Sequence, residues 1–236
     1  MPPRRIGVMM ATAAATPKTL FSVLPADVLT KLFGQARTVA LAPNQMLFLA
    51  GDPGDGCYRV NEGLLKVSFV SPSGGERILA ILGPGALVGE LAMIDGAPRS
   101  ASVAAIRETK LAFVSRAIFD AFTQANPEVY QHIAIMLARR LREIDGTLAA
   151  ASFLSLKGRV ARALLNLANA FGKDLGSGRT LIQQKVSQSD LSAMAGIARE
   201  NVSRILQDWT RRSIVSRLAG YYCLEDRAAL EQEAAL

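Results

Sequence analysis

Frequent glycines divide the chain between Thr38 and Val114 into short apolar runs, and this rhythm restricts the fold more than any other feature of the sequence. The runs LLKVSFV at 64–70 and RILAIL at 77–82 are joined by the turn sequence SPSGGE, which predicts a β-hairpin. Regular repetition of such units is typical of a sandwich or barrel, so we interpret the region as an antiparallel β-barrel of the jelly-roll type. The dividing glycines are Gly51, Gly54, Gly56, Gly63, Gly74, Gly75, Gly83, Gly85, Gly89 and Gly96.

After Ser115 the glycines stop, and the stretch from Ile118 to Ala151 is rich in helix-forming residues. Pro127 stands where a second helix could begin, so we expect a short helix followed by a long one. Apolar residues along the long helix are spaced alternately four and three apart, as in a coiled-coil seam. The seam consists of Tyr130, Ala134, Leu137, Leu141, Ile144, Leu148 and Ala151.

Charged residues border this seam and keep it narrow. A narrow stripe favours a second, identical helix as its partner, and therefore a homodimer. A helix packed against its own barrel is the alternative. The bordering residues are Arg139, Arg140, Arg142, Glu143 and Asp145.

The basic residues are concentrated in one region. Between Lys157 and Arg217 there are eleven Lys and Arg against four Asp and Glu, which accounts for the whole formal net charge of +7. Such a local excess favours a polyanionic partner, either nucleic acid or an acidic membrane surface. Half of the residues are apolar and a fifth are charged, which is the composition of a folded protein.

Within this basic region, the segment 187–215 contains two short helix patterns with Gly196 between them. This arrangement predicts a helix-turn-helix. Ser187 is a candidate N-cap, with Asp190 at the third helical position in place of the usual capping-box Glu. The apolar faces that would pack the helices together are Leu191, Met194, Val202, Ile205, Leu206 and Trp209.

The second of these helices presents polar side chains that can read DNA bases. Arginine can bind guanine through two hydrogen bonds, and a glutamate can accept one from the amino group of cytosine. The alternative is that Glu200 and Arg204 only form an i,i+4 salt bridge on a solvated helix. The candidate DNA-binding residues are Gln188, Arg199, Glu200, Asn201, Ser203 and Arg204.

The segment SIVSRLAGYYCLED alternates apolar and polar residues about Ala219–Gly220, which predicts the β-hairpin wing of a winged helix. The expected fold is therefore α+β, with a β-barrel, a long dimerisation helix and a C-terminal winged helix-turn-helix. We expect four parts: a flexible tail at 1–19, the barrel domain at 20–126, the dimerisation helix at 127–151 and the DNA-binding domain at 152–236.

Inside the barrel, the segment 85–105 places Gly89 and Glu90 at a strand-to-helix corner, with Arg99 and Ser100 one short helix and turn later. A phosphodiester anion requires an arginine and hydrogen-bond donors, and a glutamate can accept from a sugar hydroxyl. These residues suit a cyclic phosphate and its ribose. A buried Glu–Arg pair that only braces the barrel is the alternative.

This chain lacks the residues that several other classes of protein require. Cys57 and Cys223 form no CxxC motif or Cys/His cluster, and His132 is the single histidine, so we expect no metal site, iron–sulfur cluster, cupin-like metalloenzyme or other enzymatic activity. No later stretch approaches the ~20 apolar residues that span a bilayer, which predicts no membrane segment and a cytoplasmic protein. Residues 4–15 resemble a short signal peptide only superficially, and we interpret them as part of the mobile tail.

Taken together, these residues resemble the CRP/FNR family of transcription regulators, and the resemblance extends from about Leu20 to Glu225. It rests on both the barrel and the C-terminal region. The matching positions are Pro43, Gly51–Asp52, Tyr58, Val60, Gly63, Gly74, Glu76, Leu82–Gly85, Gly89–Glu90, Arg99–Ser100 and the runs LARRL (137–141), KGRVARALL (157–165) and ARENVSRIL (198–206).

The resemblance implies a cyclic-nucleotide effector whose binding repositions two DNA-binding domains. It also implies that Arg199, Glu200 and Arg204 read a half-site similar to TGTGA, with half-sites ~34 Å apart in a palindromic operator, and that RNA polymerase is a further partner. Branches of the family that use an iron–sulfur cluster or haem need cysteines or axial ligands that this chain lacks. The residues that the resemblance places at the nucleotide are Gly89, Glu90, Leu91, Arg99, Ser100 and Arg140.

The chain departs from the family at two points. Members that bind cyclic AMP usually carry a Thr–Ser pair facing the purine, where this chain has Ile144–Asp145. A carboxylate can accept from both N1–H and the 2-amino group of guanine, which favours cyclic GMP over cyclic AMP. A barrel that binds no ligand, with DNA binding independent of any nucleotide, is the alternative. The second departure is Ala198, which removes a hydroxyl cap from the recognition helix.

Overall fold

The computed structural model describes residues 25–72 and 74–235 of the chain. The predicted tail at 1–19 lies outside the described residues. So do the side chains of Arg139, Arg140 and Glu143 on the long helix, although the backbone of that helix is described.

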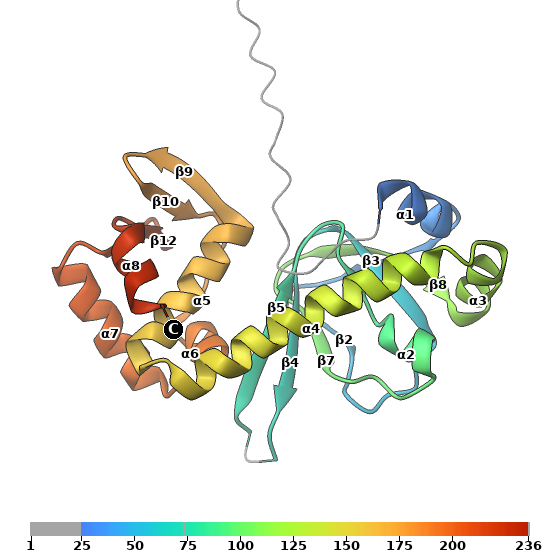
Figure 1. Ribbon diagram of the computed structural model, residues 1–236, viewed down its shortest axis with the longest axis horizontal. Helices are drawn as coiled ribbons and strands as arrows, with labels where there is room; N and C mark the ends of the chain where they lie inside the picture. Colours follow the sequence, from blue (N-terminus) through green and yellow to red (C-terminus); the bar gives the residue numbers. More distant parts are fainter. Residues whose placement is uncertain (1–24, 73, 236) are drawn as a thin grey trace, which may run out of the picture.

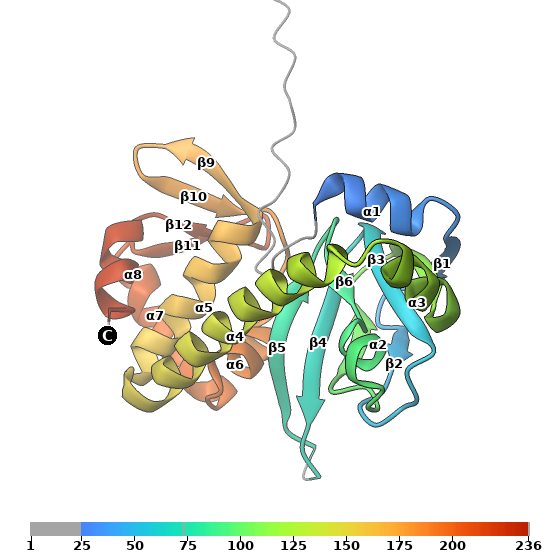
Figure 2. The same cartoon turned by 45° about the vertical axis from the view of Figure 1, so that its right-hand side comes forward.

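The N-terminal part contains eight antiparallel strands in two four-stranded sheets (Figures 1 and 2). Their orders are β1-β8-β3-β6 and β2-β7-β4-β5, so the predicted antiparallel β-fold is confirmed, with the two sheets remaining separate. The strands are β1 (Arg37–Leu41), β2 (Met46–Phe48), β3 (Gly56–Glu62), β4 (Leu65–Val70), β5 (Glu76–Leu82), β6 (Leu87–Val88), β7 (Ser102–Ala105) and β8 (Thr109–Ser115).

Apolar residues from both sheets form one core between them. Val60 of β3 and Leu111 of β8 belong to one sheet, while Leu65 of β4 and Val103 of β7 belong to the other, and all four are buried. The predicted hairpin is present, because β4 pairs with β5 from Leu65 opposite Leu82 to Val70 opposite Glu76. This hairpin extends well beyond the rest of the sheet (Figures 1 and 2).

Helices cover the ends of this part of the molecule. They are α1 (Ala26–Phe33), α2 (Leu91–Asp95) and α3 (Arg116–Ala125). Ser115 is the N-cap residue of α3, and its side chain accepts a hydrogen bond from the Ile118 amide. Sequence patterns identified α3 but not α1, whose buried residues Val28, Leu29, Leu32 and Phe33 pack into the same core as α3.

The long helix is α4 (Val129–Phe153), and it connects the two parts of the molecule (Figure 1). Its first turns are packed, because Val129, Ile133 and Met136 belong to the core beneath α1 and α3. Beyond that point the apolar side chains of α4 are largely exposed. The helix is therefore anchored at one end and bare along the other.

The C-terminal part is a helical domain with a four-stranded sheet of order β11-β12-β10-β9. Its core is built around the fully buried Trp209, with Leu164, Leu191 and Val202. The elements are α5 (Leu156–Phe171), β9 (Gly172–Gly176), β10 (Arg179–Ile182), α6 (Gln188–Ala195), α7 (Arg199–Arg211), β11 (Val215–Leu218), β12 (Tyr221–Leu224) and α8 (Arg227–Glu233).

The glycine-rich sequence GKDLGSG is a strand and a turn rather than the break that its composition suggests. Strand β9 pairs with β10, and Gly176 at the end of β9 and Ser177 and Gly178 in the turn have positive φ angles. Two glycines at such a turn allow the chain to reverse without steric cost. The pairing adds an edge hairpin to the sheet of the wing.

The two parts of the molecule share a packed interface. Leu64, Ile78 and Ile81 of the N-terminal part belong to the same buried cluster as the core of the helical domain. Helix α6 lies against β5 at this interface, as both views show (Figures 1 and 2). The first helix of the helix-turn-helix is therefore docked on the β4–β5 hairpin.

Candidate functional site

Arg99 is the buried cation of the N-terminal part, with 4% of its surface exposed. Its Nη1 donates to the Gly89 carbonyl at 2.7 Å, and its Nη2 donates to Asp55 Oδ1 at 2.7 Å and to the Gly56 carbonyl at 2.8 Å. Its Nε has no hydrogen-bond partner within the described part of the chain. The guanidinium also lies 4.3 Å from the centre of the Phe48 ring. Arg99 is thus held in one orientation by three different segments.

Backbone geometry at Gly89 makes this arrangement possible. Gly89 has φ +82°, and a Cβ at this position would overlap Arg99 Nη1. A residue with a side chain would be strained by its backbone angle and would also displace the guanidinium. The glycine at the strand-to-helix corner is therefore required by the position of Arg99.

The rest of the predicted phosphate-binding group follows along α2. Glu90 is the N-cap residue of this helix and is 1% exposed, and Leu91 is its first residue and half-buried. Ser100 is exposed at the approach to β7. Of the predicted group, Gly89 therefore contacts Arg99. Glu90, the residue after Gly89, is buried, and Ser100 lies at the surface.

The long helix supplies the residues predicted to face the purine. Ile144 is 55% exposed and Asp145 is also exposed. Among the described residues, no hydrogen bond or ion pair joins Asp145 to Arg99. The side chain of Arg140 lies outside the described part of the structure. Within the described part of the chain, Ile144 and Asp145 are thus exposed residues with no hydrogen bond or ion pair to Arg99.

The predicted seam forms a bare apolar stripe on α4. Leu141 and Leu148 are 60% and 67% exposed, and Ile144 lies between them. Leu137 is half-buried against the barrel core, and Ala151 is half-buried near the end of the helix. Leu137 and Ala151 are therefore partly covered by the same chain, whereas Leu141, Ile144 and Leu148 between them are exposed.

The helix-turn-helix has the local geometry that its sequence predicts. Ser187 accepts from the Asp190 amide at 3.0 Å, and Asp190 accepts from the Ser187 amide at 2.9 Å, which forms a capping box. Gly196 ends α6 in a left-handed conformation with φ +65°. Helix α7 begins after Ala198 without any side-chain cap, as expected from the missing hydroxyl.

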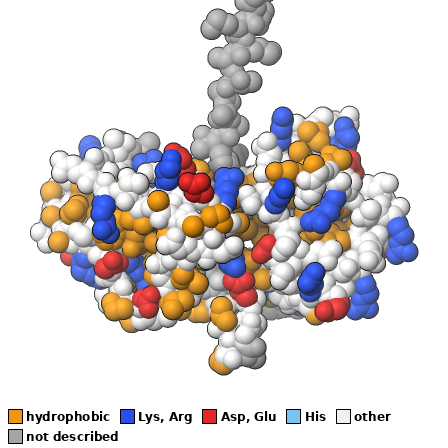
Figure 3. Space-filling view, turned by 180° about the vertical axis from the view of Figure 1, so that it is seen from behind, with side chains coloured by type: hydrophobic (Ala, Val, Ile, Leu, Met, Phe, Trp, Pro, Cys, Tyr) orange, Lys and Arg blue, Asp and Glu red, His pale blue; other side chains and the backbone are white. Residues whose placement is uncertain are grey.

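The outward face of α7 carries the candidate base-reading residues. Arg199, Glu200 and Arg204 are exposed, while Asn201 and Ser203 are half-buried. Arg204 donates a hydrogen bond to Asn201 Oδ1, and among the described residues no ion pair joins it to Glu200. Gln188 is half-buried at the start of α6. Several Lys and Arg side chains are also spread over the C-terminal part, on the right in Figure 3.

The wing follows α7 directly. Strands β11 and β12 pair from Val215 opposite Leu224 to Leu218 opposite Tyr221. Ala219 and Gly220 at the turn have φ angles of 51° and 88°, and two positive values are what a type I′ hairpin turn requires. The predicted hairpin and its turn residues are therefore present.

Comparison with known proteins decides the family. Residues 38–126 match the cyclic nucleotide-binding domain, and residues 158–233 match the Crp-like helix-turn-helix domain. Over 201 residues the chain is 31% identical to the CRP-like cAMP-activated global transcriptional regulator of Mycobacterium tuberculosis, which covers 85% of this chain and 89% of that protein. The chain belongs to the CRP/FNR family of transcription regulators.

Two further CRP/FNR proteins agree with this assignment. The Cyclic AMP receptor protein of Thermus thermophilus is 37% identical over 186 residues, covering 79% of this chain and 82% of that protein. The solved structure of TTHA1359, a CRP/FNR-family regulator from the same species, superposes with a TM-score of 0.69 at 26% identity, covering 84% of this chain and 98% of that one. As CRP/FNR members are transcription regulators and not enzymes, this protein is a DNA-binding regulator of transcription.

Asp55 and Phe48 contact Arg99, and no CRP/FNR motif found in the sequence pointed to them. The only local signal is the segment GDPGDG at 51–56, where two aspartates lie among turn-forming residues just before a strand. Asp52 in this segment accepts from the Leu49 amide, and its carbonyl accepts from the Arg99 amide at 2.8 Å. The loop therefore binds Arg99 through the Asp55 carboxylate and the carbonyls of Asp52 and Gly56.

None of the described helices is both long and apolar enough to span a bilayer. Within residues 25–72 and 74–235, no three or more His, Cys, Asp or Glu side chains gather in a way that could hold a metal ion.

Proposed function

We propose that this regulator is a homodimer whose affinity for DNA is controlled by a cyclic nucleotide bound at Arg99. The observation that carries the proposal is the buried guanidinium, which is fixed by Gly89, Gly56 and Asp55 and rests on Phe48. An oriented arginine with limited access to water is a strong partner for a phosphodiester anion. Its unpartnered Nε–H is a further donor for that anion.

The bare stripe of α4 supports the homodimer. A second copy of the helix would cover Leu141, Ile144 and Leu148, which are exposed in the single chain. Two α7 helices related by a two-fold axis would then enter successive major grooves ~34 Å apart. We therefore propose a palindromic operator with TGTGA-like half-sites that Arg199, Glu200 and Arg204 read. We further propose that the protein acts in the cytoplasm and contacts RNA polymerase at the promoter.

The dimer also bears on which nucleotide is bound. We propose that α4 presents Ile144 and Asp145 to the base, where the Asp145 carboxylate favours guanine because guanine offers two adjacent donors. The relatives from M. tuberculosis and T. thermophilus are named for cyclic AMP. We therefore propose that this chain prefers cyclic GMP and differs in its effector from those relatives.

A second function is supported by the same buried arginine. The Asp55 carboxylate already forms an ion pair with Arg99 Nη2 at 2.7 Å, and the carbonyls of Gly89 and Gly56 accept further hydrogen bonds from the guanidinium. A carboxylate in this position competes with a phosphate for the guanidinium. A protein in which Asp55 permanently neutralises Arg99 would bind DNA without any nucleotide.

Calorimetric titration of the full chain with cyclic GMP and with cyclic AMP tests these proposals, with operator binding measured alongside. We expect heat of binding from at least one nucleotide, tighter binding of cyclic GMP, and a change in operator affinity. Tighter binding of cyclic AMP would contradict the role of Asp145 alone. Absence of heat and of any effect on operator affinity would establish the nucleotide-independent function instead.

A further inference from the structure

Among the groups that hold the Arg99 guanidinium, the Asp55 carboxylate is the exposed one. The Asp55 side chain is 64% exposed, whereas the Arg99 side chain is 2% exposed. The Gly56 carbonyl belongs to a buried residue, and Phe48 is half-buried. An anion that approaches Arg99 from solvent therefore meets the Asp55 carboxylate before it reaches the guanidinium.

The Asp55 side chain has a single partner and can leave it. Its Oδ1 accepts from Arg99 Nη2 at 2.7 Å, and no other side-chain hydrogen bond of Asp55 exists among the described residues. The backbone is fixed instead, because the Arg116 amide donates to the Asp55 carbonyl at 3.0 Å. A carboxylate that rotates away from Arg99 is solvated by water, yet it stays tethered beside the guanidinium.

A second carboxyl group lies close to Arg99 on the other segment that contacts it. Glu90 is 1% exposed and directly follows Gly89, whose carbonyl accepts from Arg99 Nη1. The nearby thiol of Cys57 responds to both charges. Burial raises the pKa of Cys57 to about 12, and the charge of Glu90 also raises it, whereas the charge of Arg99 lowers it. Glu90 and Arg99 therefore act on the same small region with opposite signs.

The Tyr58 ring, whose centre lies 5.9 Å from Arg99 Cζ, is influenced by the remaining charges of this region. Burial raises the pKa of Tyr58, and the charge of Asp55 raises it further. Arg99 and the exposed Arg37 on β1 lower it. Positive and negative charges are thus nearly balanced around Arg99 before any ligand binds.

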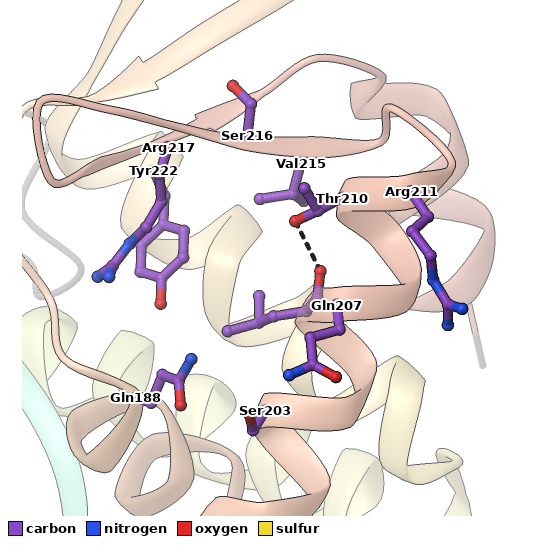
Figure 4. A pocket seen from close by; sticks show the side chains of 10 residues that line it. Gln188, Ser203, Gln207, Thr210, Arg211, Val215, Ser216, Arg217 and Tyr222 are labelled. Atoms are coloured by element: carbon purple, nitrogen blue, oxygen red, sulfur yellow. Dashed lines mark hydrogen bonds between the residues drawn. The ribbon is translucent and has the colours of Figure 1, made fainter.

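The other arginine-lined site of this chain has no such balance. A hollow of about 510 Å³ lies between α7 and the wing, with Arg211 on α7 and Arg217 on β11 among its lining residues (Figure 4). None of the described residues that line it is acidic. An arginine site without a carboxylate in its lining suits anions of any charge, whereas the site at Arg99 contains its own anion.

Cyclic and linear nucleotides differ mainly in charge at the phosphate. A cyclic phosphodiester carries a single negative charge, whereas a phosphate monoester carries about −1.5 to −2 at pH 7. Hydrolysis of the cyclic ester gives the monoester of the same nucleoside, so the base and most of the ribose are unchanged. A second charge beside a buried guanidinium requires a further cation. Asp55 places a like charge there instead.

We propose that Asp55 makes the effector site selective for ligand charge. A cyclic phosphodiester would replace the carboxylate at Arg99 Nη2 one charge for one, and the tethered Asp55 would then repel a phosphate monoester that binds in the same place. Asp55 is therefore a specificity-determining residue that separates cyclic nucleotides from linear 5′-monophosphates. The inference rests on the proposed function, because it requires a nucleotide at Arg99, and it holds for either base.

Calorimetric titration of the full chain measures this selectivity as the ratio of two dissociation constants, that of a 5′-monophosphate over that of the cyclic nucleotide with the same base. Guanine and adenine pairs are both used, and the weaker ligand is measured by displacement. Asp55→Asn keeps an acceptor for Arg99 Nη2 but removes the charge. We expect tighter binding of the cyclic nucleotide and a ratio lowered by about 5–10-fold. An equal loss of affinity for both ligands would show that Asp55 only positions Arg99, and would overturn the proposal.

Glu62→Gln is the matched control. Glu62 is 66% exposed and forms an ion pair with Lys110 at 2.9 Å, so it resembles Asp55 in exposure and in pairing. It lies at the far end of β3, roughly 20 Å along the strand at ~3.3 Å per residue, which exceeds the screening length of ~10 Å. We expect an unchanged ratio for Glu62→Gln, and for Asp55→Glu, which retains the charge. A ratio lowered equally by Glu62→Gln and Asp55→Asn would reduce the effect to net charge and refute a specific role of Asp55.

Salt provides a measurement that a purely structural role of Asp55 would not affect. The screening length falls from about 10 Å at 0.1 M salt to about 3 Å at 1 M. The difference in ratio between wild type and Asp55→Asn should therefore shrink as salt is added, and a constant difference would contradict the proposal. If neither protein binds any of the nucleotides, the proposed function itself fails. If the wild type binds a cyclic nucleotide with the same ratio as Asp55→Asn, only the present inference fails.

Discussion

The guanidinium of Arg77, on β5, lies against Gly196, the turn residue of the helix-turn-helix. The two residues are far apart in sequence, and their contact lies at the interface where α6 packs on the β4–β5 hairpin. Burial lowers the pKa of Arg77, and the nearby charge of Arg159 lowers it further. The turn of the DNA-binding motif is thus in direct contact with the nucleotide-binding domain.

Gly196→Ala should destabilise the protein and loosen this interface. Its φ of +65° costs an alanine roughly 1–2 kcal/mol, and the added Cβ would overlap the Arg77 guanidinium. Gly178→Ala is the matched control, since Gly178 has φ +74° with nothing within 4 Å of an added Cβ. We expect a larger fall in melting temperature for Gly196→Ala, measured by calorimetry. Equal falls would show that Arg77 moves aside without cost.

Gly89→Ala should abolish nucleotide binding. The Cβ would overlap Arg99 Nη1 and force the guanidinium out of the position set by Asp55 and Gly56. Gly96→Ala shares the positive φ, here +72°, but meets open space, so it should retain binding. Calorimetric titration of both variants distinguishes them, and a Gly89→Ala variant with unchanged affinity would refute the placement of the phosphate at Arg99.

Leu148→Glu should convert the proposed dimer into a folded monomer. Leu148 is 67% exposed, so the single chain does not depend on it, whereas two copies buried in a seam contribute about 1.5–3 kcal/mol each. We expect the dimer dissociation constant to rise at least ~100-fold, measured by sedimentation. Ile118→Glu on α3, 50% exposed and away from the seam, is the control. Dissociation by both variants, or by neither, would contradict the α4 seam.

Glu225 should stabilise the wing only above acidic pH. The hydrogen bond from Ser216 lowers the pKa of Glu225 from its ordinary value of 4.5, with smaller contributions from Cys223 and Arg179. A carboxylate with a lowered folded-state pKa contributes stability above the unfolded pKa, and this contribution is lost as the pH falls through the folded pKa. The stability difference between wild type and Glu225→Gln should therefore be constant near neutral pH and vanish in acid. A difference that persists below the folded-state pKa would exclude the Ser216 hydrogen bond as its cause.

The elements predicted from sequence are those specified by neighbouring residues. Ser187 and Asp190 are three residues apart, Gly196 terminates its own helix, and Ala219–Gly220 is a self-contained turn, so each leaves a local pattern. The same holds for β4 and β5, whose apolar runs are joined by the turn sequence SPSGGE. Local spacing therefore predicted the helix-turn-helix, the wing and the main hairpin.

Contacts between distant segments left no such pattern. Asp55 pairs with Arg99 across 44 positions, and Arg77 meets Gly196 only because two domains pack together. The β9–β10 hairpin was also missed, because its glycines resemble a linker until β10 is paired with β12. In the proposed dimer, the position of Asp145 relative to the nucleotide would likewise depend on contacts with a second chain.

Trp209 is the only tryptophan of the chain, and it is fully buried on the inner face of α7. Its indole emission therefore reports on the DNA-binding domain alone. Unfolding followed by this signal would miss an independent transition of the nucleotide-binding domain, which contributes only the weaker emission of tyrosine. Comparing tryptophan emission with circular dichroism in one denaturation series would thus show, without any label, whether the two domains unfold together.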